Sequence, residues 1–356
     1  MDSQQRHKIA SIIFIIFLMA VLFFFGKGSE DFSWPKGRIE IDGGYREVMG
    51  TFARVVAVAM EEEKGRECVE AGFEVIEQVD NSMSDYKSDS ELSMVNREAF
   101  EKDVKISAEL FDVLRKSVEY SRKTAGAFDV TVGPLVDLFR LAEEEGFTPT
   151  EEQIAGAKEK VGYEKLKLDE QNMTVKFAVE GMRIDLGGIA KGYSIDKAIK
   201  IMQKCGAIGA MVDIGGDIKC FGAPPTGKKF WKIGLQEPGD MKEGVAEGEL
   251  SLVLSLTDAA IATSGDYRRY VLLDGKKYSH IIDARTGAGS EGLSSVTIIS
   301  DDAIDADALA TAVSVMGTEK GLELIESLEN TEAILISSKD KAKLITTSGA
   351  EKYIKP

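Results

Sequence analysis

The sequence predicts an α+β fold, built as a single large domain of mixed sheets and helices behind an apolar N-terminal segment. The chain has 356 residues, and about 320 of them follow that segment, which is enough for one large domain. Segments of strand-like composition alternate with segments of helical spacing. Their order is mixed rather than a regular strand and helix alternation, and this favours α+β over a doubly wound parallel sheet.

The composition is that of an ordinary globular protein. Hydrophobic residues make up 44% of the chain and charged residues 29%, which excludes disorder over most of its length. The formal net charge of −16 argues against a nucleic-acid partner, because binding a polyanion requires clustered lysine and arginine. The three cysteines, Cys68, Cys205 and Cys220, lack the spacing of a metal site. Buried thiols are therefore favoured over a redox role.

The N-terminus carries an unbroken apolar run at residues 9–25, preceded by Arg6, His7 and Lys8. The run is short for a membrane span and long for the apolar core of a signal peptide. Since no small-x-small cleavage site follows, an uncleaved signal anchor is favoured over a removed signal peptide. The short N-terminal tail favours a cytoplasmic N-terminus, with the folded domain on the extracytoplasmic side of the cytoplasmic membrane. The expected divisions are a tail at 1–8, a transmembrane signal anchor at 9–25, a polar tether at 26–44 and the folded domain at 45–356.

The elements of the folded domain are expected in the following order. A strand at 50–60 precedes a helix at 61–79 with a glutamate-rich start. Ser107 is expected to cap a second helix, whose apolar stripe ends before Gly126. The remaining elements are a turn and helix at 130–145, a charged helix at 150–161, short strands within 164–184, a helix after the glycine pair near 188, strands near 210–214, 231–236, 250–256, 268–273 and 293–299, two helices between 302 and about 328, and closing strands.

Asp307 and Thr311 stand four residues apart in a strongly helical pattern. This spacing places both side-chain oxygens on one face of the helix. A carboxylate and a hydroxyl placed in this way can share one hard cation. An exposed helix face with no ligand is the alternative interpretation.

The segment Asp185–Gly192 contains a glycine pair followed by the start of a helix. The glycines allow a backbone to approach a ligand closely, the helix N-terminus offers free N–H groups to an anion, and Lys191 adds a positive charge. A simple turn from strand to helix explains the same residues equally well. The spacing matches neither a P-loop nor a dinucleotide-binding fingerprint.

Three further segments carry weaker signals. Thr263, Ser264 and the residues up to Asp266 are expected in a tight turn that could contact phosphate, although ordinary turn chemistry is an equal alternative. His280 is the only histidine beyond the N-terminal segment, and a lone histidine is more often structural than catalytic. Tyr86 could stack on a planar ring, although a surface role is the more common one.

Six ordered motifs together resemble those of the FAD:protein FMN transferases, the ApbE family. The resemblance runs from about Met49 to Gly317, and it departs at Ala284, where the family usually has proline. The motifs are Gly126–Asp129 with Gly133–Leu135, Asp185–Tyr193, Asp213–Asp217, Thr263–Asp266, His280–Asp283 with Arg285–Gly287, and Asp307–Thr311.

The resemblance implies an Mg²⁺-dependent enzyme that splits FAD at its pyrophosphate. Such an enzyme transfers FMN to a threonine or serine hydroxyl of a partner protein and releases AMP. Asp307, Thr311 and the backbone carbonyl of Gly188 would hold the metal, and His280 and Asp307 are the expected catalytic residues. The expected FAD site comprises Met49, Tyr86, Lys87, Ser88, Ala127, Phe128, Asp129, Asp185, Lys191, Thr263, Ser264 and His280.

Acceptors of the family carry a motif similar to Asp-Gly-x-Thr/Ser-Gly-Ala-Thr/Ser. They are membrane subunits of sodium-translocating NADH:quinone reductase and of RNF electron-transport complexes, and this chain contains no such motif. Two alternatives stay open. Water could replace the acceptor, which would make the protein an Mg²⁺-dependent FAD pyrophosphatase, or the chain could be a non-catalytic exported flavin-binding protein. Loss of Asp307 and Thr311 would favour the latter, and both are present.

Overall fold

A computed structural model describes residues 34–236, 250–265, 270–273, 276–339 and 344–354. The chain divides at Arg38 into a small N-terminal unit and one folded unit that extends to its end. The expected tail, signal anchor and first part of the tether lie outside the described residues. Among the residues that are described, no helix is both long enough and apolar enough to cross a membrane.

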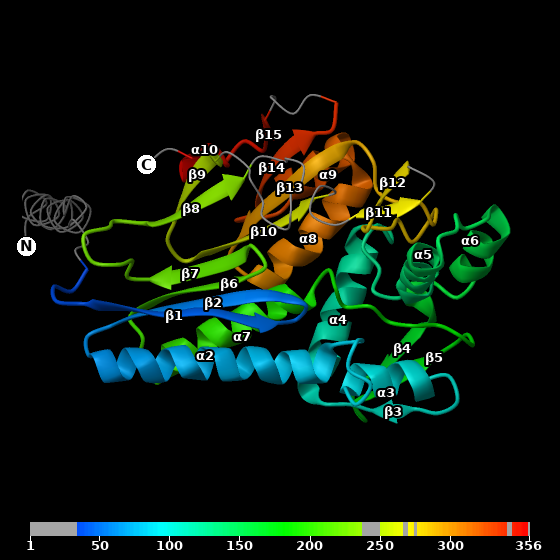
Figure 1. Ribbon diagram of the computed structural model, residues 1–356, viewed down its shortest axis with the longest axis horizontal. Helices are drawn as coiled ribbons and strands as arrows, with labels where there is room; N and C mark the ends of the chain where they lie inside the picture. Colours follow the sequence, from blue (N-terminus) through cyan, green and yellow to red (C-terminus); the bar gives the residue numbers. More distant parts are fainter. Residues whose placement is uncertain (1–33, 237–249, 266–269, 274–275, 340–343, 355–356) are drawn as a thin grey trace, which may run out of the picture. The chain divides into compact units, whose positions relative to one another are not determined.

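An eight-stranded sheet organises the folded unit (Figure 1), and every pair of neighbouring strands in it is antiparallel. The sheet order is β1-β2-β6-β7-β10-β13-β14-β15. The bounds are β1 Ile39–Val48, β2 Thr51–Ala59, β6 Gly209–Ile214, β7 Asp217–Gly222, β10 Ala259–Gly265, β13 Leu293–Ser300, β14 Glu332–Ser337 and β15 Leu344–Thr346. All eight residues of β13 are buried, so this central strand is covered on both faces.

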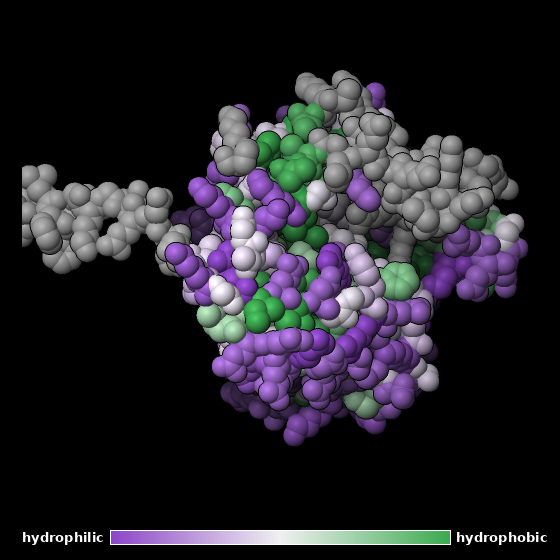
Figure 2. Space-filling model, turned by 60° about the vertical axis from the view of Figure 1, so that its left-hand side comes forward, coloured by the Kyte–Doolittle hydropathy of each residue, from purple (hydrophilic) through white to green (hydrophobic). Residues whose placement is uncertain are grey.

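Helices cover one face of the sheet. The helix α2 (Glu62–Met83) packs on β1 and β2, α7 (Ala190–Cys205) packs on β6 and β7, and α8 (Ala303–Met316) packs on β10 and β13. Apolar side chains from α2 and α7, among them Phe73 and Met202, are fully buried against the sheet. The helix α9 (Thr318–Glu326) covers β14. Figure 2 shows that hydrophilic residues dominate the surface in the view turned by 60°, with a hydrophobic band through its middle.

A second layer of short elements is inserted in the chain between α2 and α7. Its core continues into the residues beneath α8. Ser107 caps α4 by accepting a hydrogen bond from the Leu110 N–H at 3.2 Å, as the sequence predicts. The elements are α3 Glu91–Glu98, β3 Val104–Lys105, α4 Ala108–Lys123, α5 Gly133–Glu145, α6 Glu151–Lys158, the 3₁₀-helix Tyr163–Lys165, β4 Leu166–Asp169 and β5 Thr174–Phe177.

Two hairpins and a terminal helix complete the described structure. One hairpin is β8 (Trp231–Gln236) with β9 (Leu250–Leu256), and α10 (Glu351–Ile354) lies against β9. The other is β11 (Tyr270–Leu273) with β12 (Lys276–Ser279), and β11 contacts α5. The mixture of an antiparallel sheet with separate groups of helices confirms the predicted α+β class.

The expected tether at 26–44 is wrong in its last residues, because β1 already begins at Ile39. Ile39 to Asp42 pair with β2, and the register shifts between Asp42 and Tyr45. Gly43 lies at this bulge, where an added Cβ would stand 2.4 Å from a Val69 methyl carbon of α2. The glycines that suggest a linker are therefore the residues that let the strand pass close to a helix. The folded domain starts at Arg38 rather than at residue 45.

Gly192 of α7 lies directly against the start of α8. A Cβ at this position would stand 2.2 Å from the Ala303 carbonyl oxygen, which is backbone and cannot move aside cheaply. Small residues at such crossings let two helices approach to backbone contact. The first turn of α7 is thereby held against α8.

We expect Gly192→Ala to destabilise the protein by about 1–3 kcal/mol, because the new methyl group forces α7 away from α8. Gly156→Ala is the matched control, since Gly156 is an exposed residue of α6 with no atom within 4 Å of an added Cβ. The control should gain about 0.5–1 kcal/mol from its helix propensity. Urea unfolding measures both, and equal effects in the two variants would contradict the close crossing.

Candidate active site

The first turn of α7 lies beside two buried carboxylates. Ile189 precedes the helix without a side-chain capping bond, and Asp307 of α8 supplies what it lacks. The Asp307 carboxylate accepts a hydrogen bond from the Gly192 N–H at 3.0 Å. The Lys191 ammonium forms an ion pair with Asp217 of β7 and stands 3.6 Å from Asp307 Oδ1. One cation and two carboxylates from three elements therefore meet at the helix N-terminus.

Burial sets the electrostatics of this group. It raises the pKa of Asp307 to about 6, with Asp217 acting in the same direction and Lys191 opposing both. Burial alone would lower the pKa of Lys191, but Asp217 and Asp307 together raise it above its ordinary value. Lys191 is therefore charged at neutral pH, and it is shared between two carboxylates. The group has one more acidic than basic member, which favours a further cation.

Gly188 and Thr311 stand next to each other at the same place. Thr311 lies one turn after Asp307 on α8, and a Cβ added to Gly188 would be 2.9 Å from its hydroxyl oxygen. The Phe128 ring approaches the same position at 3.4 Å. No group of three or more His, Cys, Asp or Glu side chains within the described ranges has metal-binding geometry. A cation here would therefore rely on one carboxylate, one hydroxyl and a backbone carbonyl, which are the oxygen ligands of a hard metal.

Thr263 joins this site through its backbone. The pairing of β10 with β7 ends at Ile261 opposite Ile218, and the Thr263 N–H donates instead to the Asp217 carboxylate at 3.0 Å. The Thr263 hydroxyl lies 3.0 Å from that of Thr297 on β13. Both threonines line a cavity of about 380 Å³ between the sheet and the β8–β9 hairpin.

The tight turn expected at Thr263 and Ser264 is wrong, because both residues are in β10 and pair with β13. Their backbone belongs to the sheet ladder and is not an open anion cradle. The last residue of that motif, Asp266, lies outside the described residues. Asp217, the last residue of the motif Asp213–Asp217, has a central place in the site that the sequence does not predict, because it binds both Lys191 and the Thr263 N–H.

The segment Ala127–Asp129 is buried in the core beneath the site. Ala127 and Phe128 are buried, and the Phe128 ring packs edge to face on Tyr120. Asp129 is also buried, and its carboxylate accepts hydrogen bonds from the Thr131 N–H, the Thr131 hydroxyl and the Tyr163 N–H at 2.7–2.9 Å. Burial raises the pKa of Asp129 against the effect of these bonds. Its side chain thus holds the loop under Gly188 in place.

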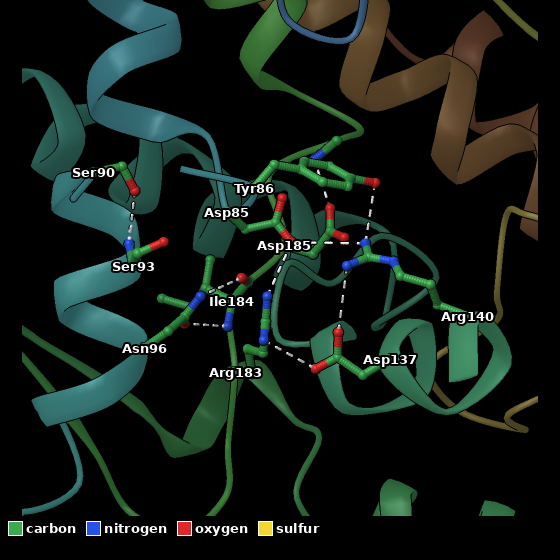
Figure 3. Close-up of polar contacts among 11 residues, drawn as sticks. Asp85, Tyr86, Ser90, Ser93, Asn96, Asp137, Arg140, Arg183, Ile184 and Asp185 are labelled. Atoms are coloured by element: carbon green, nitrogen blue, oxygen red, sulfur yellow. Dashed lines mark hydrogen bonds and ion pairs between the residues drawn. The ribbon is translucent and has the colours of Figure 1, made fainter. Parts of the chain in front are cut away.

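A second group of expected site residues gathers around Asp185 (Figure 3). The Asp185 N–H donates to the Val130 carbonyl, and its carboxylate accepts from the Gly187 N–H at 2.7 Å. The Tyr86 ring lies nearby with 75% of its surface exposed. Its hydroxyl accepts a hydrogen bond from Arg140 of α5 at 3.1 Å. Asp185 and Tyr86, almost 100 residues apart in sequence, therefore contribute to one surface.

The other expected flavin contacts have mainly structural partners. The Lys87 ammonium binds the Asp80 carboxylate at 2.6 Å, and the Ser88 carbonyl accepts a hydrogen bond from Arg97. Met49 forms the tip of the β1–β2 hairpin with a φ of +52°, and its side chain packs against both main hydrophobic clusters. These contacts fix the Tyr86 loop and the hairpin tip.

His280 follows β12 and is exposed. Within the loop after it, Arg285 and Asp283 form a salt bridge at 2.9 Å. Ala284, at the position where the family usually has proline, is buried against Leu135 and Val161. The loop therefore keeps a defined place on α5 and α6 without the proline ring.

The fold and site together define an α+β protein in which a paired lysine at a helix N-terminus lies beside oxygen groups of the type that bind a hard cation. The chain belongs to the ApbE family, which it matches over residues 49–335. A curated relative, the FAD:protein FMN transferase of Haemophilus influenzae, is 35% identical over 298 residues, which cover 82% of this chain and 84% of the relative. The FAD:protein FMN transferase of Vibrio cholerae is 33% identical over 283 residues, which cover 79% and 82%.

Solved structures show the same fold. The crystal structure of an ApbE protein from Thermotoga maritima superposes with a TM-score of 0.79 at 29% identity, covering 90% of this chain and all of that one. The flavin transferase ApbE from Vibrio cholerae superposes with a TM-score of 0.75 and the same identity and coverage.

We expect Asp129→Ala to destabilise the protein by about 2–4 kcal/mol, because it leaves three donors around a buried position without their acceptor. Asp169→Ala is the matched control. Asp169 also accepts three hydrogen bonds, from Gln171 and Asn172, but in an exposed turn, so water replaces the lost acceptor and its loss should cost far less than the loss of Asp129. Urea unfolding of the two variants decides this, and a similar loss in both would refute the structural role of Asp129.

Proposed function

We propose that this protein transfers FMN from FAD to a threonine or serine hydroxyl of a partner protein, and that it needs Mg²⁺ and releases AMP. The observation that carries the proposal is the arrangement of Lys191, Asp307, Thr311 and Gly188 around the N-terminus of α7. Membership of the ApbE family and the names of its relatives support the transferase class.

The site suits the pyrophosphate of FAD. The first turn of α7 places the positive end of the helix dipole and the Lys191 ammonium at the site, and the preceding glycines allow a phosphate to approach the backbone. The Gly192 N–H is not available to a ligand in this arrangement, because it donates to Asp307. The Lys191 ammonium is held in this position by Asp217 and Asp307. These residues would bind and orient the phosphates, which is the main requirement of phosphoryl transfer.

Asp307, Thr311 and the carbonyl of Gly188 would hold Mg²⁺, since their oxygens are of the type that this cation prefers. When bound, the ion would neutralise charge on the phosphates and stabilise the leaving group. Because the buried carboxylates outnumber Lys191, the site can accept this charge.

The reaction balances without any further reagent. The acceptor hydroxyl oxygen forms a bond to the phosphorus of the FMN half of FAD, and the bond from that phosphorus to the bridging oxygen breaks. The electron pair of the broken bond leaves with AMP, and the hydroxyl proton passes to a base. The products are a phosphoester-linked flavin and AMP. Water in place of the hydroxyl would give FMN and AMP, which is the pyrophosphatase reaction.

His280 is our candidate for the group that takes the hydroxyl proton. It is exposed, and its loop is fixed on α5 and α6, so an acceptor protein could reach it. A hydroxyl attacks poorly until its proton is removed.

The partners follow from the same proposal. The acceptor would carry a segment similar to Asp-Gly-x-Thr/Ser-Gly-Ala-Thr/Ser, as in subunits of RNF or of sodium-translocating NADH:quinone reductase. The apolar residues 9–25 would anchor the enzyme in the cytoplasmic membrane, with the catalytic domain on the extracytoplasmic side. Confinement to one membrane surface would raise the effective concentration of enzyme and acceptor for each other.

The full chain, solubilised in detergent with FAD, Mg²⁺ and a protein that bears the acceptor motif, tests the proposal. We expect the acceptor mass to rise by one FMN while AMP appears in equal amount. AMP without a modified acceptor would identify a pyrophosphatase instead. Tight FAD binding with neither product would identify a flavin-binding protein.

We expect Thr311→Val to raise the Mg²⁺ concentration for half-maximal transfer by at least about tenfold, because one oxygen ligand is lost while the shape is kept. Ser314→Ala is the control on the same helix, since the Ser314 hydroxyl bonds the Ala310 carbonyl within α8. Transfer rates measured against Mg²⁺ concentration should leave the control unchanged. An unaltered Mg²⁺ requirement in Thr311→Val would remove this residue from the metal site.

We expect His280→Ala to lower the rate of FMN transfer by about 100-fold while FAD binding is retained, because the acceptor proton loses its base. Added imidazole should restore part of the rate. His7→Ala, which removes the only other histidine, is the control and should transfer FMN normally. Full activity in His280→Ala would assign the proton to another group.

A further inference from the structure

We infer that Arg140 positions Tyr86 as a stacking platform for a planar ring of FAD, and that it does so without touching the ligand. This inference rests on the proposed function and names a residue that its site does not include. Arg140 belongs to α5, whereas Tyr86 belongs to the loop between α2 and α3. Their contact therefore joins two separate segments of the second layer.

The contact between the two side chains has two components. The Arg140 guanidinium carbon lies 4.7 Å from the centroid of the Tyr86 ring, which is the geometry of a cation–π interaction. Its Nη2 also donates a hydrogen bond to the Tyr86 hydroxyl at 3.1 Å. The guanidinium thus restrains both the tilt of the ring and the position of its hydroxyl. With 75% of Tyr86 exposed, the ring still offers a large surface to a ligand.

Arg140 is itself held by an ion-pair network (Figure 3). Arg140 lies 3.7 Å from the Asp85 carboxylate and 3.8 Å from that of Asp137. Arg183 binds the same two carboxylates at 3.1 and 3.3 Å. Only 12% of the Asp85 side chain is exposed, so its charge requires these partners. Asp85 adjoins Tyr86 in sequence, and the network therefore fixes the backbone from which the ring projects.

The network also connects Tyr86 with Asp185. Arg183 precedes Asp185 by two residues in the chain, and Figure 3 shows Tyr86, Arg140 and Asp185 directed toward one another. Burial raises the pKa of Asp185, and Arg140 is among the charges that oppose this rise. The guanidinium of Arg140 therefore acts on both residues expected to contact FAD, on Tyr86 by direct contact and on Asp185 through its charge alone.

Preorganisation explains why this matters for affinity. A tyrosine on an exposed loop samples several rotamers, and a ligand must restrict them when it binds. With one part of the ring restrained by Arg140, most of that restriction is already present before FAD arrives. Loss of Arg140 should therefore weaken FAD binding even though the ligand contacts are unchanged.

A double-mutant cycle tests the inference, with FAD affinity measured by flavin fluorescence in the presence of a chelator and without acceptor, so that no turnover occurs. We expect Arg140→Ala to weaken FAD binding about 3- to 10-fold and Tyr86→Ala to weaken it at least as much. The double variant should bind no more weakly than Tyr86→Ala, because Arg140 acts through the ring. Wild-type affinity in Arg140→Ala, or penalties that multiply in the double variant, would overturn the inference.

Two further variants separate positioning from stability. Arg115→Ala removes an exposed arginine that pairs with Asp112 at 3.4 Å on α4, and it should change neither FAD affinity nor the urea midpoint. Arg140→Lys keeps the positive charge near Asp85 but lacks the planar guanidinium, and its FAD affinity should fall between wild type and Arg140→Ala. If Arg140→Lys binds FAD as weakly as Arg140→Ala while both unfold at the wild-type midpoint, planarity alone accounts for the positioning. A loss of affinity that follows only a lower unfolding midpoint would overturn the inference in favour of a structural role.

The same titrations with FMN and with AMP identify the ring that stacks. Weaker FMN binding in Arg140→Ala assigns Tyr86 to the isoalloxazine, and weaker AMP binding assigns it to the adenine; if neither changes, the inference fails. The proposed function is judged separately by FMN transfer to the acceptor. A wild-type protein that binds FAD but transfers nothing would contradict the function, and the cycle on Arg140 and Tyr86 would still stand.

Discussion

The buried ion group of Lys191, Asp217 and Asp307 is the constraint on which the rest of the site depends. It links the start of α7 to a strand of the sheet and to α8. A buried charge is tolerated only when it is paired, and the loss of one partner leaves the others uncompensated. The sheet and two helices must therefore keep one relative arrangement, and the first turn of α7 is capped by a carboxylate from a neighbouring helix instead of by its own preceding residue.

Glycines make this arrangement possible at two positions. At Gly192 the missing side chain lets α8 reach the helix start, and at Gly188 it leaves room beside Thr311 and Phe128. Below them, Asp129 fixes the supporting loop through three hydrogen bonds. Some polar residues of the site therefore face the proposed ligand position, whereas others, such as Asp129, hold the supporting loop in place. The sequence motifs alone do not distinguish these two groups.

Features with a strong local signal could be predicted from the sequence, and features that depend on distant partners could not. The cap at Ser107 and the shared helix face of Asp307 and Thr311 follow from spacing within a few residues. The strand β10, with its run of small residues, has little β-propensity of its own and is set by its neighbours β7 and β13. The glycines at the bulge in β1 are typical of a linker when taken alone, and only the pairing with β2 places them in a strand. Arg140 belongs to no recognisable motif. Its role depends on its contact with a loop more than 50 residues away, which the sequence does not predict.

The pairing of β2 with β6 has a consequence for how the chain reaches its native state. These neighbouring strands are separated by about 150 residues, which form α2, the whole second layer and α7. Closing so long a loop is entropically costly, so we expect this strand pair to form late, after the inserted layer has acquired its own helices. Since α7 leads directly into β6, the ion group of Lys191, Asp217 and Asp307 is completed only in the last stage of folding, and a partly folded chain lacks it.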